Sequence, residues 1–310
     1  MNNSGKRAAA HKPPFLKRLL KFLYITLFIL SLIVVAAYAA LNIFAPEPTV
    51  DSQVTIDPNR GTVVFTPSAE ATDQVDASAA PAPDALVLHR REGVYTCLLL
   101  GVADQGGTDT IMLGVFDTKG GTASLISIPR DTVVYTDGKY RKITSTSSGG
   151  AEAVGAAVHD LLGVPIDYYV SVNLKAFQSI VDQIGGVWFD VPVRMDYEDP
   201  YGDLYIHIAP GYQHLSGKQA MGVMRCRNCY SNADIGRAAT QRAFLVALAK
   251  QTIVPSNVTK VTSLINTFSQ YVRSDMSLNN MVYFGTQAIG MDLDSALNTG
   301  SLEGDWISPY

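Results

Sequence analysis

Charged side chains in this sequence follow directly on apolar runs of strand length, where neutral residues would fold more easily. Asp104 and Asp109 lie in a Gly-rich loop between two such runs, and Arg130 and Asp131 follow the run that ends at Ile128. Two aspartates at the end of a strand can hold Mg²⁺ through oxygen ligands, whereas a lone Asp in such a loop is usually a turn residue. Metal binding and a structural turn therefore both stay open for this pair.

A second group of polar residues lies where one predicted helix ends and the next begins. Arg225 and Arg227 end the first helix, and Asp234, Arg237 and Gln241 open the second. A cation in the first turn opposes the helix dipole unless an anion binds there, and helix amino termini bind phosphate well. Arg237 and Gln241 share one face above an apolar stripe, which suits an amphiphile with a phosphate head. Spacing alone favours the plainer alternative, in which Arg237 pairs with Asp234 over ordinary core.

Alternating strands and helices must position these groups. Apolar or alternating runs of strand length occupy residues 94–102, 110–116, 122–128, 167–174 and 187–191. Helical spacing occupies residues 151–162, 177–184, 212–224 and 235–252. The turn at residues 119–121 predicts that the second and third runs form a hairpin. Interleaved strands and helices predict an α/β layered domain.

The amino-terminal region predicts a membrane anchor. Residues 1–21 carry six basic residues and no acidic one, and an uncharged apolar run begins at Phe22 and extends to Leu41. A helix of ~20 apolar residues spans a bilayer, and flanking cations stay on the cytoplasmic side. We therefore expect a cytoplasmic tail over 1–21 and a single-pass cell-membrane anchor over 22–44 with its amino terminus inside. A cleaved signal peptide is the alternative, but its apolar region is typically only ~7–15 residues long.

The residues after the anchor divide into two parts by composition. Residues 45–92 are rich in Pro, Ala, Asp, Thr and Ser without a sustained apolar period, which predicts a flexible extracellular stalk. Residues 93–310 form the expected extracellular globular domain. After residue 21 the chain holds all 28 acidic residues but only 18 of the 24 basic ones. A nucleic-acid partner is therefore not expected, because such affinity comes mainly from neutralised phosphates.

The three cysteines leave their chemistry open. Cys97 lies in an apolar run and is expected in the core, whereas Cys226 and Cys229 have C-x-x-C spacing. Zinc would need two further ligands, and the sequence contains only scattered histidines that could supply them. Outside the cell a Cys226–Cys229 disulfide and a free pair are equally compatible with the sequence.

Taken in order, these motifs resemble the LytR-CpsA-Psr family of Gram-positive envelope proteins. The resemblance covers residues 95–255 and is carried by the segments 98–101 (LLLG), 108–113 (TDTIML), 127–132 (SIPRDT), 142–143 (KI), 149–150 (GG), 181–187 (VDQIGGV), 225–227 (R-x-R), 234–237 (D-x-GR) and Gln241. The family's fold, an α/β/α sandwich, implies a three-layer domain with a central mixed sheet. Its members move a glycopolymer, such as teichoic acid or capsule, from a polyprenyl-pyrophosphate carrier to peptidoglycan.

The resemblance also implies roles for individual residues. It implies Mg²⁺, with Mn²⁺ as an alternative, on Asp109 and Asp104. It implies pyrophosphate contacts from Arg130, Arg225, Arg227, Arg237 and Gln241. Catalysis would rest on Arg130, Asp131, Asp234 and Arg237, with Asp234 orienting an arginine or aiding the acceptor. Mg²⁺ and bidentate arginines would neutralise the charge of a pyrophosphate leaving group.

Two departures from the family pattern bear on function. The first loop has Gly101-Val102-Ala103-Asp104 where the family usually has Gly-x-Asp, and its gap to the second Asp, Asp109, is shorter than usual. The later helix carries Thr240-Gln241-Arg242 where the family has Arg-Gln-Gln. The short loop favours the main alternative, a non-catalytic polyprenyl-phosphate-binding scaffold. A pyrophosphatase using the same residues on the same lipid carrier is a second alternative. A transcriptional attenuator is not expected, because only ~20 residues would lie in the cytoplasm and no DNA-binding element is present.

Overall fold

The computed structural model describes residues 45–50, 53–57, 62–64, 86–103, 107–200, 204–231, 234–254, 268–289 and 291–305, with the single residues 31 and 265. The tail expected over 1–21 and, apart from residue 31, the anchor expected over 22–44 lie outside this part of the chain. Within the described ranges, no helix has the length and apolar character needed to cross a bilayer.

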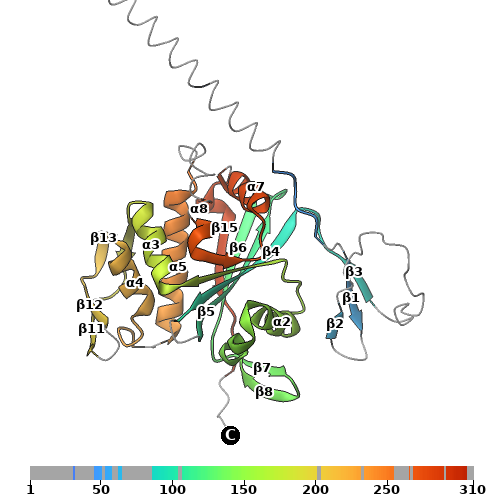
Figure 1. Cartoon of the computed structure of the whole chain (residues 1–310), viewed down its shortest axis with the longest axis horizontal. Coiled ribbons are helices and arrows are strands. Elements are labelled where there is room, and N and C mark those ends of the chain that lie inside the picture. The colour runs from blue at the N-terminus through green and yellow to red at the C-terminus, as the bar shows by residue number, and fades with distance from the viewer. Residues whose placement is uncertain are drawn as a thin grey trace, which may run out of the picture.

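A six-stranded mixed sheet forms the centre of the domain (Figure 1). Its strands, in spatial order, are β14 (Val272–Ser274), β9 (Tyr168–Asn173), β4 (Val94–Val102), β5 (Thr108–Asp117), β6 (Thr122–Ile128) and β15 (Leu297–Ser301). The pairs β4–β9 and β6–β15 are parallel and the other pairs are antiparallel. The expected β5–β6 hairpin is confirmed, with Ile111 opposite Ile128.

Helices cover both faces of this sheet, which gives three layers. Helix α2 (Gly150–Leu162) packs on one face, where its Val154 and Val158 are buried against Leu98 and Leu100 of β4. Helices α5 (Asp234–Thr252) and α7 (Leu278–Ile289) lie on the other face. The alternation of β4 explains this arrangement, because successive side chains of a strand point to opposite faces.

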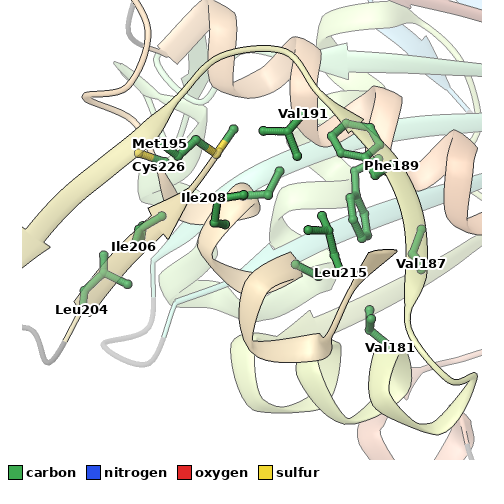
Figure 2. Close-up of a cluster of buried hydrophobic side chains, with 13 residues drawn as sticks. Val181, Val187, Phe189, Val191, Met195, Leu204, Ile206, Ile208, Leu215 and Cys226 are labelled. Carbon is green, nitrogen blue, oxygen red and sulfur yellow. The ribbon is translucent and has the colours of Figure 1, made fainter. Parts of the chain in front are cut away.

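A second apolar cluster supports the end of the domain that carries the arginine motifs. It joins α3 (Leu174–Gln183), α4 (Gly217–Arg225) and α5 to the antiparallel pairs β10 (Val187–Val191) with β13 (Gly211–Leu215) and β11 (Met195–Asp199) with β12 (Leu204–Ile208). Strands β10 and β12 alternate buried and exposed residues, so each contributes one face to the cluster. Figure 2 shows Cys226 beside Met195 within this cluster.

The helix predicted over residues 212–224 is wrong at its beginning. Residues 211–215 form strand β13, and α4 begins only after Ser216, which caps it through a reciprocal capping box with Gln219. Pairing of β13 with β10 decided this, because a cross-strand ladder can override local helical spacing.

Part of the segment expected as a stalk has regular structure. Strands β1 (Gln53–Asp57), β2 (Thr62–Val64) and β3 (Leu86–His89) form a small antiparallel sheet. Ala45 is buried against Tyr95 and Tyr283 of the domain. The Arg90 guanidinium donates to both carboxylate oxygens of Asp167 at 2.7 and 2.6 Å. The packed unit therefore begins earlier than the boundary at residue 92 that composition predicted.

Candidate functional site

One carboxylate gathers three arginines at the amino terminus of α5. Asp234 is the first residue of this helix. Its Oδ1 lies 2.9 Å from Arg237 Nη2 and 3.1 Å from Arg227 Nε, and its Oδ2 accepts a hydrogen bond of 3.2 Å from Arg130 Nε. The Arg237–Asp234 pairing that the sequence left open is therefore present. Because the three cations come from three separate segments, Asp234 fixes their relative positions.

Arg130 connects this cluster to the sheet. It lies two residues beyond the end of β6, and its Nη1 donates to Asp109 Oδ1 on the neighbouring strand β5 at 2.6 Å. Its carbonyl oxygen accepts from the backbone N–H of Thr144, whose hydroxyl donates to the carbonyl of Thr108. Arg130 is thus held at both its backbone and its side chain. The adjacent strand ends bring residues 109 and 130 together.

Two further predicted residues do not pair with Asp234. The Asp131 carboxylate lies 2.7 Å from Lys142 Nζ, which lowers the pKa of Asp131 below its ordinary value. Arg225 is the last residue of α4 and forms no ion pair within the described part of the chain. Sequence reasoning missed Lys142 as the partner of Asp131, although the Asp137-Gly138 dipeptide is a local hairpin signal that pairs residues 133–136 with 139–142.

Gln241 lies beneath the cluster rather than on its surface. The residue is only 4% exposed, and its amide oxygen accepts from Thr110 Oγ1 at 3.0 Å. Its amide nitrogen donates to the carbonyl of Met224 at 2.9 Å. Gln241 therefore joins β5, α4 and α5, which are the elements that carry Asp109, Arg225 and Arg237.

The site is cationic even without a ligand. Three arginines (130, 227 and 237) accompany two carboxylates, Asp109 and Asp234, because Asp131 is engaged by Lys142. Burial lowers the pKa of Arg237, whose side chain is 10% exposed. For Arg130 burial acts in the same direction, but the hydrogen bond to Asp109 and the charge of Asp234 outweigh it and raise the pKa. A multiply charged anion can satisfy these guanidinium groups in a bidentate manner.

The residues described here offer only part of a metal site. Asp109 presents a carboxylate that is 42% exposed, whereas Asp104 lies outside the described residues. No cluster of three or more His, Cys, Asp or Glu side chains suitable for a metal occurs in the described part of the chain. Mg²⁺ is often bound through one or two carboxylates together with substrate phosphates. The oxygen donor of Asp109 therefore fits an ion that is bound jointly with a phosphate substrate.

An apolar cavity of about 400 Å³ lies between the sheet and helices α5 and α7. Its lining includes Leu99 of β4, Phe284 of α7, and Leu245 and Ala249 of α5. Burial raises the pKa of Cys97, which also lines it, to about 12, so this thiol stays neutral at physiological pH. Arg237 and Ala249 are about 18 Å apart along the helix axis. One helix thus carries both the arginine cluster and a wall of the cavity.

A disulfide lies within the arginine motif. Cys226 and Cys229 are bonded and enclose Arg227 and Asn228. Cys226 is fully buried in the cluster of Figure 2, whereas Arg227 is exposed and reaches Asp234. The bridge therefore limits the freedom of the segment that presents Arg227.

Comparison with known proteins matches this chain to a recognised family. The model of the LytR_cpsA_psr family matches residues 62–305. TagV of Bacillus subtilis (strain 168), named a polyisoprenyl-teichoic acid–peptidoglycan teichoic acid transferase, is 28% identical over 204 residues, or 62% of this chain and 52% of TagV. TagU of Bacillus anthracis carries the same activity in its name and is 32% identical over 59% of this chain and 61% of TagU. These matches therefore span only about half to three fifths of the relatives' lengths.

Solved structures agree with the fold. The crystal structure of B. subtilis TagV has a TM-score of 0.62 and 26% identity, covering 71% of this chain and 89% of that chain. A structure of TagT bound to LI-WTA has a TM-score of 0.53 and 22% identity, covering 68% of this chain and 78% of that chain. At that identity the second comparison supports the fold alone.

Proposed function

Because this chain belongs to the LytR_cpsA_psr family, we propose that it is a phosphotransferase that moves a glycopolymer from a polyprenyl-pyrophosphate carrier to peptidoglycan. The convergence of Arg130, Arg227 and Arg237 on Asp234 is the observation that carries this proposal. These cations suit a pyrophosphate, and the apolar cavity suits its polyprenyl chain. The names of the TagV and TagU relatives support a teichoic-acid-like glycopolymer and peptidoglycan as the acceptor.

The reaction assigned to this site breaks the phosphoanhydride bond of the carrier and forms a phosphodiester. A hydroxyl oxygen of peptidoglycan attacks the phosphorus linked to the glycopolymer, and the bond from that phosphorus to the bridging oxygen breaks. Polyprenyl monophosphate leaves with that oxygen. Asp234 orients the guanidinium groups and takes the proton of the attacking hydroxyl, while Arg130 and Arg237 neutralise charge on the phosphates. In phosphoryl transfer, positioning and charge stabilisation supply most of the rate.

We assign the metal position to Asp109, with Asp104 as its expected second ligand. Mg²⁺, or Mn²⁺ in its place, would add charge neutralisation on the pyrophosphate oxygens when bound. Asp109 is now paired with Arg130. Release of that pair on substrate binding would let the guanidinium turn to the phosphate.

Turnover of a defined donor tests the proposal. The full-length chain in detergent is incubated with a polyprenyl-pyrophosphate oligosaccharide, with and without Mg²⁺, and polyprenyl monophosphate is followed by mass spectrometry. Arg130→Ala should lower kcat by about 10²–10³, as for loss of one transition-state donor. Lys218→Ala, an exposed cation of α4, is the matched control. An equal kcat for wild type and Arg130→Ala would contradict the site assignment.

The same experiment separates the alternatives. Release that needs peptidoglycan fragments indicates transfer, whereas equal release with water alone indicates a pyrophosphatase. Binding of the lipid without any release, unaffected by EDTA, indicates a scaffold. Any shortened version of the protein should retain residues 45–50, because Ala45 and Glu47 contact Tyr95.

A further inference from the structure

A solvent-facing pair of tyrosines lies on a hairpin that leaves the site directly. Strands β7 (Val133–Thr136) and β8 (Lys139–Lys142) are antiparallel, with Tyr135 opposite Tyr140. Tyr135 is 58% exposed and Tyr140 is 71% exposed, and the centroids of their rings are 4.9 Å apart. The mechanism proposed above uses neither ring.

The hairpin is fixed to the site at its base. The N–H of Ile143 donates to the carbonyl of Thr132 at 2.8 Å, and Lys142 holds Asp131, the neighbour of Arg130. The two-residue turn, Asp137 and Gly138, has positive φ at both positions, 51° and 74°. A turn of this kind matches the twist of the strands it joins. The hairpin is therefore held at a fixed place relative to Arg130.

The two faces of the hairpin differ. Val134 points inward and is buried in the cluster beneath α2. Side chains directly opposite each other share a face, so Val133, Tyr135, Tyr140 and Lys142 form the outer one. We call these four residues the hairpin platform. All four are exposed, although solvent-facing positions of a hairpin are ordinarily polar.

The charge of the hairpin contrasts with the rest of the domain. Residues 133–142 carry three cations against a single carboxylate, whereas the chain after residue 21 is acidic overall. Lys139 and Arg141 lie on the face of Val134, so Lys142, which pairs with Asp131, is the cation on the face of the two tyrosines. Exposed aromatic rings of this kind suit a ligand with apolar C–H faces. Glycan strands have this chemistry, since pyranose rings present C–H faces to aromatic rings.

We propose that the hairpin platform binds the glycan strand of the acceptor, peptidoglycan, and delivers its hydroxyl to the phosphate held by Arg130. This inference rests on the proposed function for the identity of the acceptor. Tyr135 lies five residues beyond Arg130, or up to about 17 Å along an extended chain, so one glycan strand reaches both.

The position of the hairpin favours a glycan over a lipid surface. The segment 45–50, which directly follows the expected anchor, packs on Tyr95 near the first residues of β4, whereas Asp109 and Arg130 lie at the other end of the sheet. Figure 1 shows the hairpin at the end of the molecule remote from that segment. With an anchor at 22–44, the platform would face the cell wall.

Direct binding tests the inference without requiring turnover. Full-length protein in detergent is titrated with soluble, uncross-linked peptidoglycan oligomers, and the dissociation constant is measured by calorimetry. Tyr135→Ser/Tyr140→Ser should weaken binding at least 10-fold, whereas Tyr135→Phe/Tyr140→Phe, which keeps the rings, should stay within about twofold of wild type. Tyr212→Ser, a change at an equally exposed tyrosine of β13, is the matched control.

Each outcome decides the inference. Equal glycan affinity in the Ser, Phe and control variants would overturn it, provided that circular dichroism shows the hairpin variants folded. If the Ser variant instead loses binding to anionic phospholipid vesicles and keeps the glycan, the platform is a membrane surface and the inference is again overturned. The proposed function is scored separately by polyprenyl phosphate release, so an inactive but glycan-binding protein would refute only the phosphotransfer reaction.

Discussion

Arg130 and Asp234 are 104 positions apart in the sequence, yet Arg130 Nε donates to Asp234 Oδ2 across 3.2 Å. This bond joins the end of β6 to the first turn of α5. Asp234 also holds Arg227 and Arg237, so one carboxylate organises three cations in the absence of an anion. The arrangement explains how guanidinium groups from three segments stay close together despite their mutual repulsion.

Removing the central carboxylate should therefore destabilise the ligand-free protein and increase its response to anions. Asp234→Asn is expected to lower the free energy of unfolding by about 1–3 kcal/mol, because partly buried arginines lose their partner. Added inorganic pyrophosphate should raise the melting temperature of this variant more than that of wild type. Thermal unfolding with and without pyrophosphate measures both effects. An equal rise in melting temperature in the two proteins would show that the Asp234 carboxylate does not occupy the position where pyrophosphate binds.

Filling the cavity should discriminate among carriers by chain length. Ala249→Phe places a ring in the apolar lining, where it displaces part of the donor's polyprenyl chain. If about two methylene groups of that chain are no longer buried, the KM for a long polyprenyl donor should rise about 10-fold. A short, water-soluble donor should be unaffected. Steady-state kinetics with both donors provides the measurement, and Ala243→Phe on the exposed side of the same helix is the control. Equal effects on both donors would argue against the cavity as the lipid site.

Reduction of the disulfide should weaken both stability and turnover. Closing so short a loop is worth about 2 kcal/mol, so the double variant Cys226→Ser/Cys229→Ser should unfold at a correspondingly lower denaturant concentration. Its turnover should fall several-fold, because Arg227 gains freedom relative to Asp234. Dithiothreitol should reproduce both effects in wild type and add nothing in the variant. Unchanged turnover on reduction would show that the bridge does not position Arg227.

The Asp131–Lys142 pair should contribute to stability only above acidic pH. The hydrogen bond from Lys142 lowers the pKa of Asp131 in the folded state below its ordinary value of 3.8. The stabilisation is therefore present above pH 3.8 and is lost as the pH falls through the lower folded value. Urea unfolding of wild type and Asp131→Asn should differ at pH 7 and converge on acidification. Asp160→Asn, which removes an exposed carboxylate of α2, controls for net charge. A stability difference between wild type and Asp131→Asn that persists at low pH would show that ionisation of Asp131 is not its cause.

Sequence reasoning predicted the elements that local patterns control. The apolar runs of β4, β5 and β6 and the periodicity of α2 and α5 identified most of the sheet and two of its covering helices. Sequence reasoning failed at residues 211–215, where pairing with the distant strand β10 selects a strand instead of a helix. It also set the domain boundary too late, because the contacts of Ala45 and Arg90 with the domain are tertiary.

For the site, the sequence by itself determined which residue types are available and which family they indicate. The motif around Arg130 and the Asp234–Arg237 spacing are local, so they can be found along the chain. Only the tertiary structure decided their roles toward one another: Asp234 as the shared partner of three arginines, and Gln241 as a buried link between β5 and α4. Distances between charges depend on how strands and helices pack, and that packing is set by contacts between residues remote in the sequence.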